Sequence, residues 1–236
     1  MKPLIKQMTV ICLCLWPGII VQAQIDPFAV MQKICAAYKS GTPLRFYGSM
    51  SMYLKSNPDN IIEKMHSSYM VDGTNFICSI GPLELLSNDT YYVSADKMAK
   101  LIMIGHKKDL ANGKQIPVLN ADRFKKWIKE KRVQAVVIPG YTRSVLKLTD
   151  SGGETGYYLY KIEYDNGTGY MKQVLLETAD PNDTSRKTMV LKITYTTPVA
   201  RQKDNNTFSE QHFFSITANK VQLAPAYRGY QLINQL

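Results

Sequence analysis

The sequence predicts a mainly β protein with some α-helix (α+β): a curled antiparallel sheet, or unclosed β-barrel, with an N-terminal helix and a mid-chain helical lid. Three observations predict this class. Apolar and polar residues alternate along many short runs, turn residues such as Asp72-Gly73 separate these runs, and one helical segment interrupts them near mid-chain. Regular short strands with tight turns are typical of a barrel or a strongly curled sheet.

The longest alternating run, residues 44–55, is the strand around which we expect the sheet to be organised. Successive side chains of a strand point to opposite faces. One face therefore carries the apolar set Leu44, Phe46, Gly48, Met50, Met52 and Leu54. The other face carries the more polar set Arg45, Tyr47, Ser49, Ser51, Tyr53 and Lys55.

Further strands are expected on both sides of the mid-chain helix. Those before it are residues 61–71, 74–80, 83–86, 91–95 and 98–104, with a turn at 57–60 after the first strand. Those after it are residues 133–138, 141–149, 157–165, 170–178, 187–196 and 213–217. We expect the tail, residues 227–233, to close the edge of the sheet.

Two helices are expected. Asp26 is a good N-cap and Pro27 suits a first helical turn, so the first helix should begin there and end before Gly41. Its apolar stripe is Phe28, Met31, Ile34, Cys35 and Tyr38, which predicts that it lies against the sheet. The second helix follows Asn120 and has Phe124, Trp127 and Ile128 on one side, with Lys125, Lys126, Lys129 and Glu130 on the other.

The N-terminus is typical of an export signal. Lys2 and Lys6 precede an apolar core at residues 8–21, and Val21-Gln22-Ala23 is a small-residue cleavage site. We therefore expect residues 1–23 to be a signal peptide and residues 24–236 to be a single periplasmic or otherwise exported domain. The apolar core is too short for a good spanning helix, so we expect no transmembrane segment in the mature chain.

Two cysteines remain in the mature chain, Cys35 and Cys78. An even pair in an exported protein is a candidate disulfide, which here would join the first helix to an early strand. The alternative is two buried thiols in a packed interface, because cysteine is a common core residue.

The composition gives a basic protein. The chain has 29 Lys and Arg residues against 19 Asp and Glu, a formal charge of +10, and loss of Lys2 and Lys6 lowers this to +8. Apart from short clusters at Lys107-Lys108 and at residues 125–132, the lysines are scattered along the sequence. This favours a solvated face over attraction to an anionic membrane or acidic partner. Nucleic acid is not expected as a partner, because no binding motif is present.

No catalytic or cofactor motif is found. His66, His106 and His212 lack a second ligand at metal spacing, and no nucleophile elbow, phosphate loop or dinucleotide fingerprint occurs. The sequence therefore favours a protein that is not an enzyme and holds no cofactor and no metal.

Methionines and aromatic residues gather in the first half of the predicted sheet. Methionine is flexible and polarizable, and it recurs on surfaces that accept varied apolar partners. The candidate cavity-lining, ligand-binding residues are Phe46, Met50, Met52, Met65, Phe76, Tyr91, Met103 and Trp127. The alternative is that these residues fill a core beneath the two helices.

The order of these elements resembles the LolA-like family, the periplasmic outer membrane lipoprotein carriers. The local likenesses are residues 86–93 (Leu-Ser-Asn-Asp-Thr-Tyr-Tyr-Val), where a polar turn leads into an aromatic strand, and the later hairpin of residues 158–176 around Asn166-Gly167. The resemblance implies lipid binding and transport: an unclosed barrel with a helical lid that shelters the acyl chains of a lipoprotein.

Two functions are thus expected from different classes. The first is an exported non-enzymatic carrier or sensor that binds acyl chains, a lipoprotein or another apolar ligand in a concave sheet. The second is an envelope protein–protein interaction module with a packed core and no ligand. A pocket with convergent polar groups would instead favour an enzymatic function.

Overall fold

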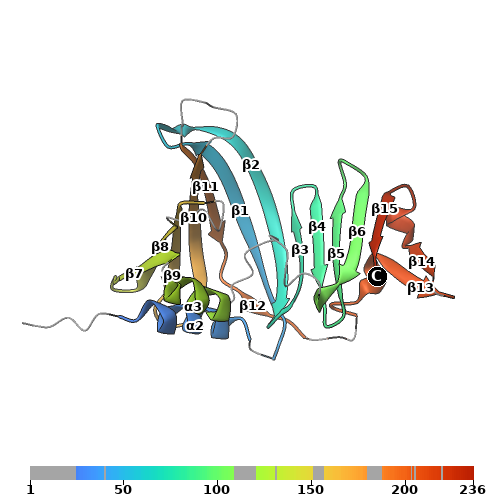
Figure 1. The fold of residues 1–236 in the computed structure, drawn as a ribbon, viewed down its shortest axis with the longest axis horizontal. Coiled ribbons are helices and arrows are strands. Elements are labelled where there is room, and N and C mark those ends of the chain that lie inside the picture. The colour runs from blue at the N-terminus through green and yellow to red at the C-terminus, as the bar shows by residue number, and fades with distance from the viewer. Residues whose placement is uncertain are drawn as a thin grey trace, which may run out of the picture.

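The computed structural model describes residues 25–39, 41–108, 121–130, 132–150, 157–179, 188–202, 204, 206–218 and 220–236. The predicted signal peptide, residues 1–23, and Asn120 lie outside this part of the chain. One 13-stranded sheet dominates the fold, in the order β15-β6-β5-β4-β3-β2-β1-β11-β10-β9-β8-β7, with the short β12 also paired to β1. Figure 1 shows the long β1 and β2 at the centre of this sheet.

Most elements before mid-chain agree with the sequence pattern, but β6 begins at Leu101 rather than at the predicted residue 98, because residues 97–100 form the turn after β5. The elements before mid-chain are α2 (Pro27–Ala37), β1 (Leu44–Leu54), β2 (Asn57–Asp72), β3 (Asn75–Ile80), β4 (Leu83–Ser87), β5 (Tyr91–Asp96) and β6 (Leu101–His106). The elements from there to β12 are α3 (Ala121–Lys129), β7 (Val133–Ile138), β8 (Arg143–Asp150), β9 (Leu159–Asp165), β10 (Met171–Ala179), β11 (Thr188–Tyr195) and β12 (Val199–Ala200). The C-terminal elements are η2 (Glu210–His212), β13 (Phe214–Thr217), β14 (Lys220–Leu223), η3 (Pro225–Tyr227) and β15 (Gln231–Gln235).

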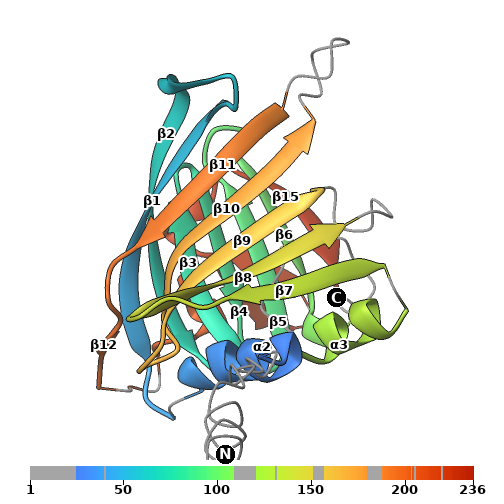
Figure 2. The same cartoon turned by 90° about the vertical axis from the view of Figure 1, so that its left-hand side faces the viewer.

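The sheet is curled but not closed into a barrel, which confirms the predicted fold class. Strands β7–β11 form one wing and β3–β6 the other, and β1 and β2 join them (Figures 1 and 2). The two end strands, β7 and β15, do not pair with each other. Helices α2 and α3 lie at one end of the wing formed by β7–β11 (Figure 2).

The first hairpin turns earlier than predicted. The turn residues are Lys55 and Ser56, and β2 already begins at Asn57, within the predicted turn at 57–60. Pro58 is tolerated there because β3 pairs with β2 only from Ser67 onward, so the outer side of this part of β2 is an edge. A proline lacks the N–H that a central strand must donate, but an edge strand does not need it.

The C-terminal tail lies along the edge of the sheet, as predicted, but its strand covers Gln231–Gln235 rather than residues 227–233. β15 adds to β6 as a parallel edge strand, whereas the remaining pairs of the large sheet are antiparallel. A separate hairpin, β13–β14, precedes it, and β14 was not predicted. Phe213, Phe214 and Tyr227 from this segment are buried against the face of β4–β6 that points away from the helices. Their partners in the sheet are Leu86, Val93, Ala95, Ile102 and Ile104.

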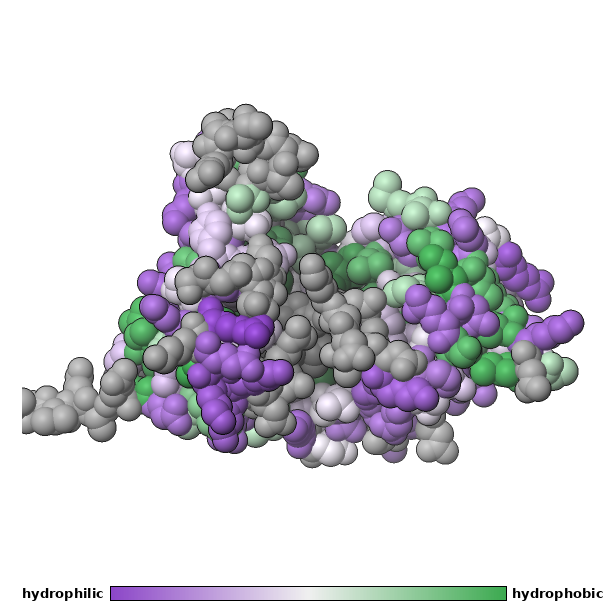
Figure 3. Space-filling model, viewed as in Figure 1, coloured by the Kyte–Doolittle hydropathy of each residue, from purple (hydrophilic) through white to green (hydrophobic). Residues whose placement is uncertain are grey.

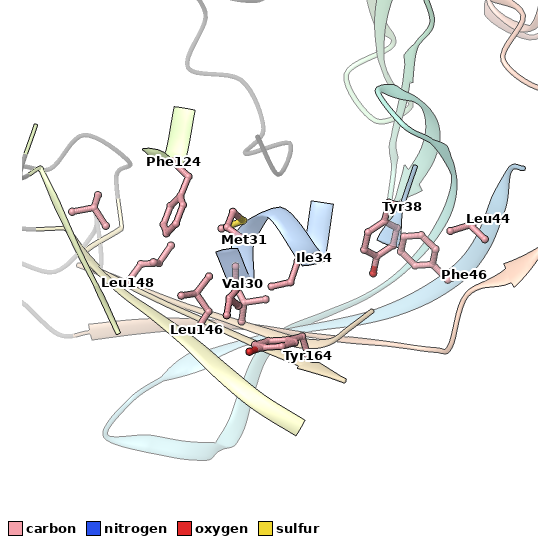
Figure 4. Close-up of a cluster of buried hydrophobic side chains, with 12 residues drawn as sticks. Val30, Met31, Ile34, Tyr38, Leu44, Phe46, Phe124, Leu146, Leu148 and Tyr164 are labelled. Carbon is pink, nitrogen blue, oxygen red and sulfur yellow. The ribbon is translucent and has the colours of Figure 1, made fainter. Parts of the chain in front are cut away.

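Helix α2 begins as its sequence predicts. Asp26 is the N-cap, its Oδ1 accepting a hydrogen bond from the Phe28 N–H at 2.9 Å, and Pro27 opens the helix. The helix then buries Val30, Met31 and Ile34. It packs on the inner face of the wing formed by β7–β9 together with Phe124 of α3 (Figure 4). We call the whole cluster of buried side chains from α2, α3 and the sheet the helix core. Its buried residues from the sheet are Leu44, Phe46, Val133, Leu146, Leu148, Ile162 and Tyr164.

Candidate functional site: the concave face of the sheet

The inner, concave face of the sheet is the candidate site, and strand register decides which residues share it. Met50 of β1 lies opposite Met65 of β2 on one side and Ile193 of β11 on the other. Met52 lies opposite Leu191 of β11. Because directly opposed residues share a face, these side chains line the side that also carries the helix core. The predicted apolar face of β1 is therefore the inner face.

An aromatic group anchors the centre of this face. The Phe46 ring stacks on Tyr69 with centroids 4.9 Å apart and meets Tyr195 edge-on at 5.9 Å. Tyr38, just after α2, packs on Phe46 at 5.7 Å, and its hydroxyl accepts a hydrogen bond from the Met171 N–H. Burial raises the pKa of Tyr38 to about 12, in keeping with its packed position. Phe46 thus lies within the helix core and is 4% exposed.

The inner face continues across β3–β6 in a second apolar cluster. Cys78, Leu85 and Tyr92 are buried there, with Phe76, Ile80, Leu83 and Met103 half-buried around them. Figure 3 shows this side of the molecule hollowed between the β1–β2 hairpin and the strands β3–β6, with hydrophobic side chains at the hollow. The concave face thus combines a packed part beneath α2 with a partly exposed apolar part.

Seven of the eight predicted lining residues lie on this face or pack against it. Phe46 and Met50 are buried, while Met52, Met65, Phe76, Met103 and Trp127 are half-buried. Tyr91 does not join them. It lies on the opposite face, edge-on to Phe214 at 5.3 Å and stacked on His106. The register of β5 turns Tyr92 inward instead, and the Tyr91-Tyr92 pair gave no periodic signal to choose between the two.

Helix α3 is fixed at one point and looser at another. Phe124 is 2% exposed within the helix core, whereas Trp127 and Ile128 are only half-buried against it. Lys125, Lys126 and Lys129 are exposed, as predicted. The Lys125 ammonium lies 4.9 Å from the centre of the Phe28 ring, a cation–π contact between α3 and α2.

Two small residues, Gly48 and Ser67, lie at the centre of the inner face, and the sequence offered no reason to propose either as a site residue. A Cβ atom at Gly48 would lie 2.5 Å from the Ser67 Oγ, which is closer than real contacts allow. That Oγ is buried and has no hydrogen-bond partner. Gly48 therefore lets the neighbouring strands bring Ser67, Tyr69 and Tyr195 together. Burial raises the pKa values of Tyr69 and Tyr195, as expected for hydroxyls held on an apolar face.

The two cysteines are not bridged to each other. Cys35 packs on the helix core from α2, whereas Cys78 belongs to the separate cluster on β3 and β4. The candidate disulfide is thus absent, and the alternative of two thiols in packed surroundings describes the structure. Burial raises the pKa of the Cys78 thiol to about 12, which suppresses the reactive thiolate.

The histidines are apart from one another. His66 is exposed on β2, His106 stacks on Tyr91, and the His212 Nε2 lies 2.9 Å from the Asn206 carbonyl oxygen. In the described part of the chain, no three His, Cys, Asp or Glu side chains are grouped so that they could hold a metal ion. The same residues include no helix with the length and apolar character needed to cross a membrane.

Comparison with known proteins gives structural likeness only. No protein-family model matches the sequence, and neither does any curated protein. An uncharacterized conserved protein from Thermus thermophilus is similar with a TM-score of 0.46 and 6% identity, over 88% of this chain and 98% of that chain. A LolA superfamily protein from Nitrosomonas europaea is similar with a TM-score of 0.39 and 9% identity, over 78% of this chain and 97% of that one.

The Pseudomonas aeruginosa MucA/MucB complex also contains a similar chain. Its TM-score is 0.36 at 10% identity, over 84% of this chain and 63% of that one. Likeness at this level says nothing of what this chain binds.

Replacing Gly48 tests the close approach at the centre of the inner face. Gly48→Ala should lower the free energy of unfolding by about 1–3 kcal/mol, because the added methyl group overpacks a filled site. Ser67→Ala removes the oxygen that the methyl group would meet, so the double variant should recover part of this loss. Urea unfolding of the three variants measures both effects. Equal losses in Gly48→Ala and in the double variant would contradict the contact.

Thiol labelling tests the state of the cysteines. With a pKa of about 12, Cys78 should remain unlabelled by iodoacetamide in the folded protein at pH 8, where about one thiol in ten thousand is ionised. Both cysteines should be labelled after unfolding in urea without reductant. Mass spectrometry of the two samples reads this directly. A protein that takes no label in urea until a reductant is added would instead contain the bridge.

Proposed function

We propose that this chain is an exported, non-enzymatic carrier or sensor that holds an acyl chain, the acyl group of a lipoprotein or another apolar ligand on the concave face of its sheet. One observation carries the proposal. Met52, Met65, Phe76 and Met103 lie on the concave side of a curled sheet, yet they are only half-buried. Apolar side chains held on a concave surface, and neither packed away nor turned out, are typical of a site that receives apolar surface.

The side chains suit a ligand that varies in shape. Methionine has an unbranched, polarizable side chain that adjusts to its neighbour at little cost. Met52, Met65 and Met103 lie outside the helix core, so these side chains can adjust to a ligand without disturbing that cluster. The LolA-like order of elements supports the same function, and an export signal at residues 1–23 would deliver the protein to an envelope compartment.

Helix α3 is proposed as the lid of this site. Phe124 holds it to the helix core, while Trp127 is half-buried and Lys126 and Lys129 point into solvent. A lid must separate from the surface on which it packs at a moderate free-energy cost. Opening of the lid would separate Trp127 from the helix core, against which it packs, while Phe124 stays buried.

A second candidate function, an envelope protein–protein interaction module, is favoured by the edge of β2. Residues 57–66 pair with β1 on one side, but β3 starts only opposite Ser67. Ile61 and Ile62 on this segment are 44% and 52% exposed. A strand with one unpaired side can accept a strand from another protein, and exposed isoleucines would add to that contact.

Opposite faces of β1 provide a matched test of the carrier. The purified, delipidated protein should take up a fluorescent fatty acid. Met52→Glu should abolish uptake, because it adds a second carboxylate opposite Glu63 and replaces an apolar side chain of the inner face. Ser51→Glu adds the same charge one residue away on the outer face and should retain uptake. Fluorescence titration measures binding, and circular dichroism verifies that both variants fold. Uptake unchanged in Met52→Glu would exclude this site.

Two aromatic truncations on α3 test the lid. Phe124→Ala should cost about 3–5 kcal/mol of unfolding free energy, the usual loss for a buried aromatic. Trp127→Ala should cost less than that and should change the rate at which bound fatty acid is released. Thermal unfolding and stopped-flow release are measured on both variants. A large stability loss in Trp127→Ala with an unchanged release rate would make α3 a structural support instead.

A further inference from the structure

The outer, convex face of the wing formed by β7–β11 carries a row of lysines that are scattered in the sequence. Strand register aligns Val136, Lys147, Lys161, Leu175, Lys192, Ser51 and Lys64 across β7, β8, β9, β10, β11, β1 and β2, each directly opposite the next. Lys64, Lys147, Lys161 and Lys192 are called the outer lysine row. The sequence neighbours of Lys147 and Lys161 pack in the helix core, and Met65 and Ile193, next to Lys64 and Lys192, lie opposite Met50 on the inner face. The row therefore faces away from the proposed ligand site.

The outer lysine row has no internal charge balance. Lys147 and Lys161 lie directly opposite each other on β8 and β9, an arrangement in which like charges repel. The nearby carboxylates are engaged elsewhere. Glu163 pairs with Arg143 at 3.0 Å and Glu177 pairs with Lys55 at 2.7 Å. None of the four lysines forms an ion pair in the part of the chain that the structure describes.

Apolar side chains border the outer lysine row at the β7 edge. Val136 belongs to the same cross-strand row and is 52% exposed, and Ile138 on the same face is 49% exposed. Tyr141, in the turn between β7 and β8, is fully exposed. Figure 2 views this wing from outside, and no other labelled helix or strand covers it. The second wing differs, because its outer face is covered by β13–β14 and Tyr227.

We infer that this outer face docks the protein on a lipid bilayer with anionic phosphate headgroups. Four unpaired ammonium groups supply the charge complementarity, and their flexible stems can follow headgroups that are themselves mobile. Exposed Val136, Ile138 and Tyr141 suit the region just below the headgroups, where aliphatic and tyrosine side chains are stabilised. An acidic protein is the less favoured partner, since its carboxylates would be fixed in position. Docking through this face leaves the concave face accessible for ligand exchange.

Vesicle binding tests this inference. The full mature chain should sediment with phosphatidylcholine vesicles that contain phosphatidylglycerol, should not sediment with phosphatidylcholine alone, and should be released as salt shortens the range of the attraction. Lys161→Gln with Lys192→Gln should weaken binding roughly thirtyfold, from the usual contribution of each lysine near an anionic surface. Lys108→Gln with Lys220→Gln removes the same charge from exposed positions elsewhere and should change binding by less than about threefold.

Three results would overturn the inference. The first is equal loss in the two double variants, which would mean that net charge alone drives binding. The second is binding that ignores lipid charge or salt. The third is no binding to anionic vesicles at low salt, in which case an acidic protein would be the better partner. Fatty-acid uptake by Lys161→Gln with Lys192→Gln should be unchanged, which separates this docking face from the proposed ligand site.

Discussion

The placement of β1 between β2 and β11 is the constraint on which the structure depends. Eleven residues, Leu44–Leu54, join the two wings, and each of their side chains is assigned to the inner or the outer face. A shift of one residue would move Met50 and Met52 outward, turn Ser51 to the inner face and remove Phe46 from the helix core. Gly48 and the Phe46 group hold this register, because Tyr69, Tyr195 and Tyr38 all pack around the one ring that β1 supplies.

The two wings are covered on opposite faces, and this asymmetry decides which face of each wing is left uncovered. Helices α2 and α3 cover the inner face of β7–β9, whereas β13–β14 covers the outer face of β4–β6. The Tyr227 hydroxyl also donates a hydrogen bond to Glu84, which fastens the C-terminal segment to β4. What remains uncovered by these elements is the apolar inner face near β3 and the basic outer face near β9. These are the two surfaces for which we propose ligand and membrane contacts.

Alternation of apolar and polar residues predicted much of the concave site. Where the prediction was wrong, the cause is local. Alternation placed Met50, Met52 and Phe46 together on one face, because a strand leaves no other arrangement. It could not place Tyr91, since both Tyr91 and its neighbour Tyr92 are apolar enough to be buried, and β13–β14 supplies a second core for one of them. Pro58 suggested a turn, but the extended edge of β2 accommodates it.

The sequence by itself determined most of the strands, the N-terminal cap of α2 and the amphipathic side of α3, because these depend on residues within a few positions of one another. It missed the short β12 and β14. Only the tertiary structure decided which strands are neighbours. Pairing across the chain aligned Lys64 with Lys147, Lys161 and Lys192, which are too far apart in sequence to form a pattern. It likewise separated Cys35 from Cys78 and joined β15 to β6, because long-range register is set by packing rather than by local preference.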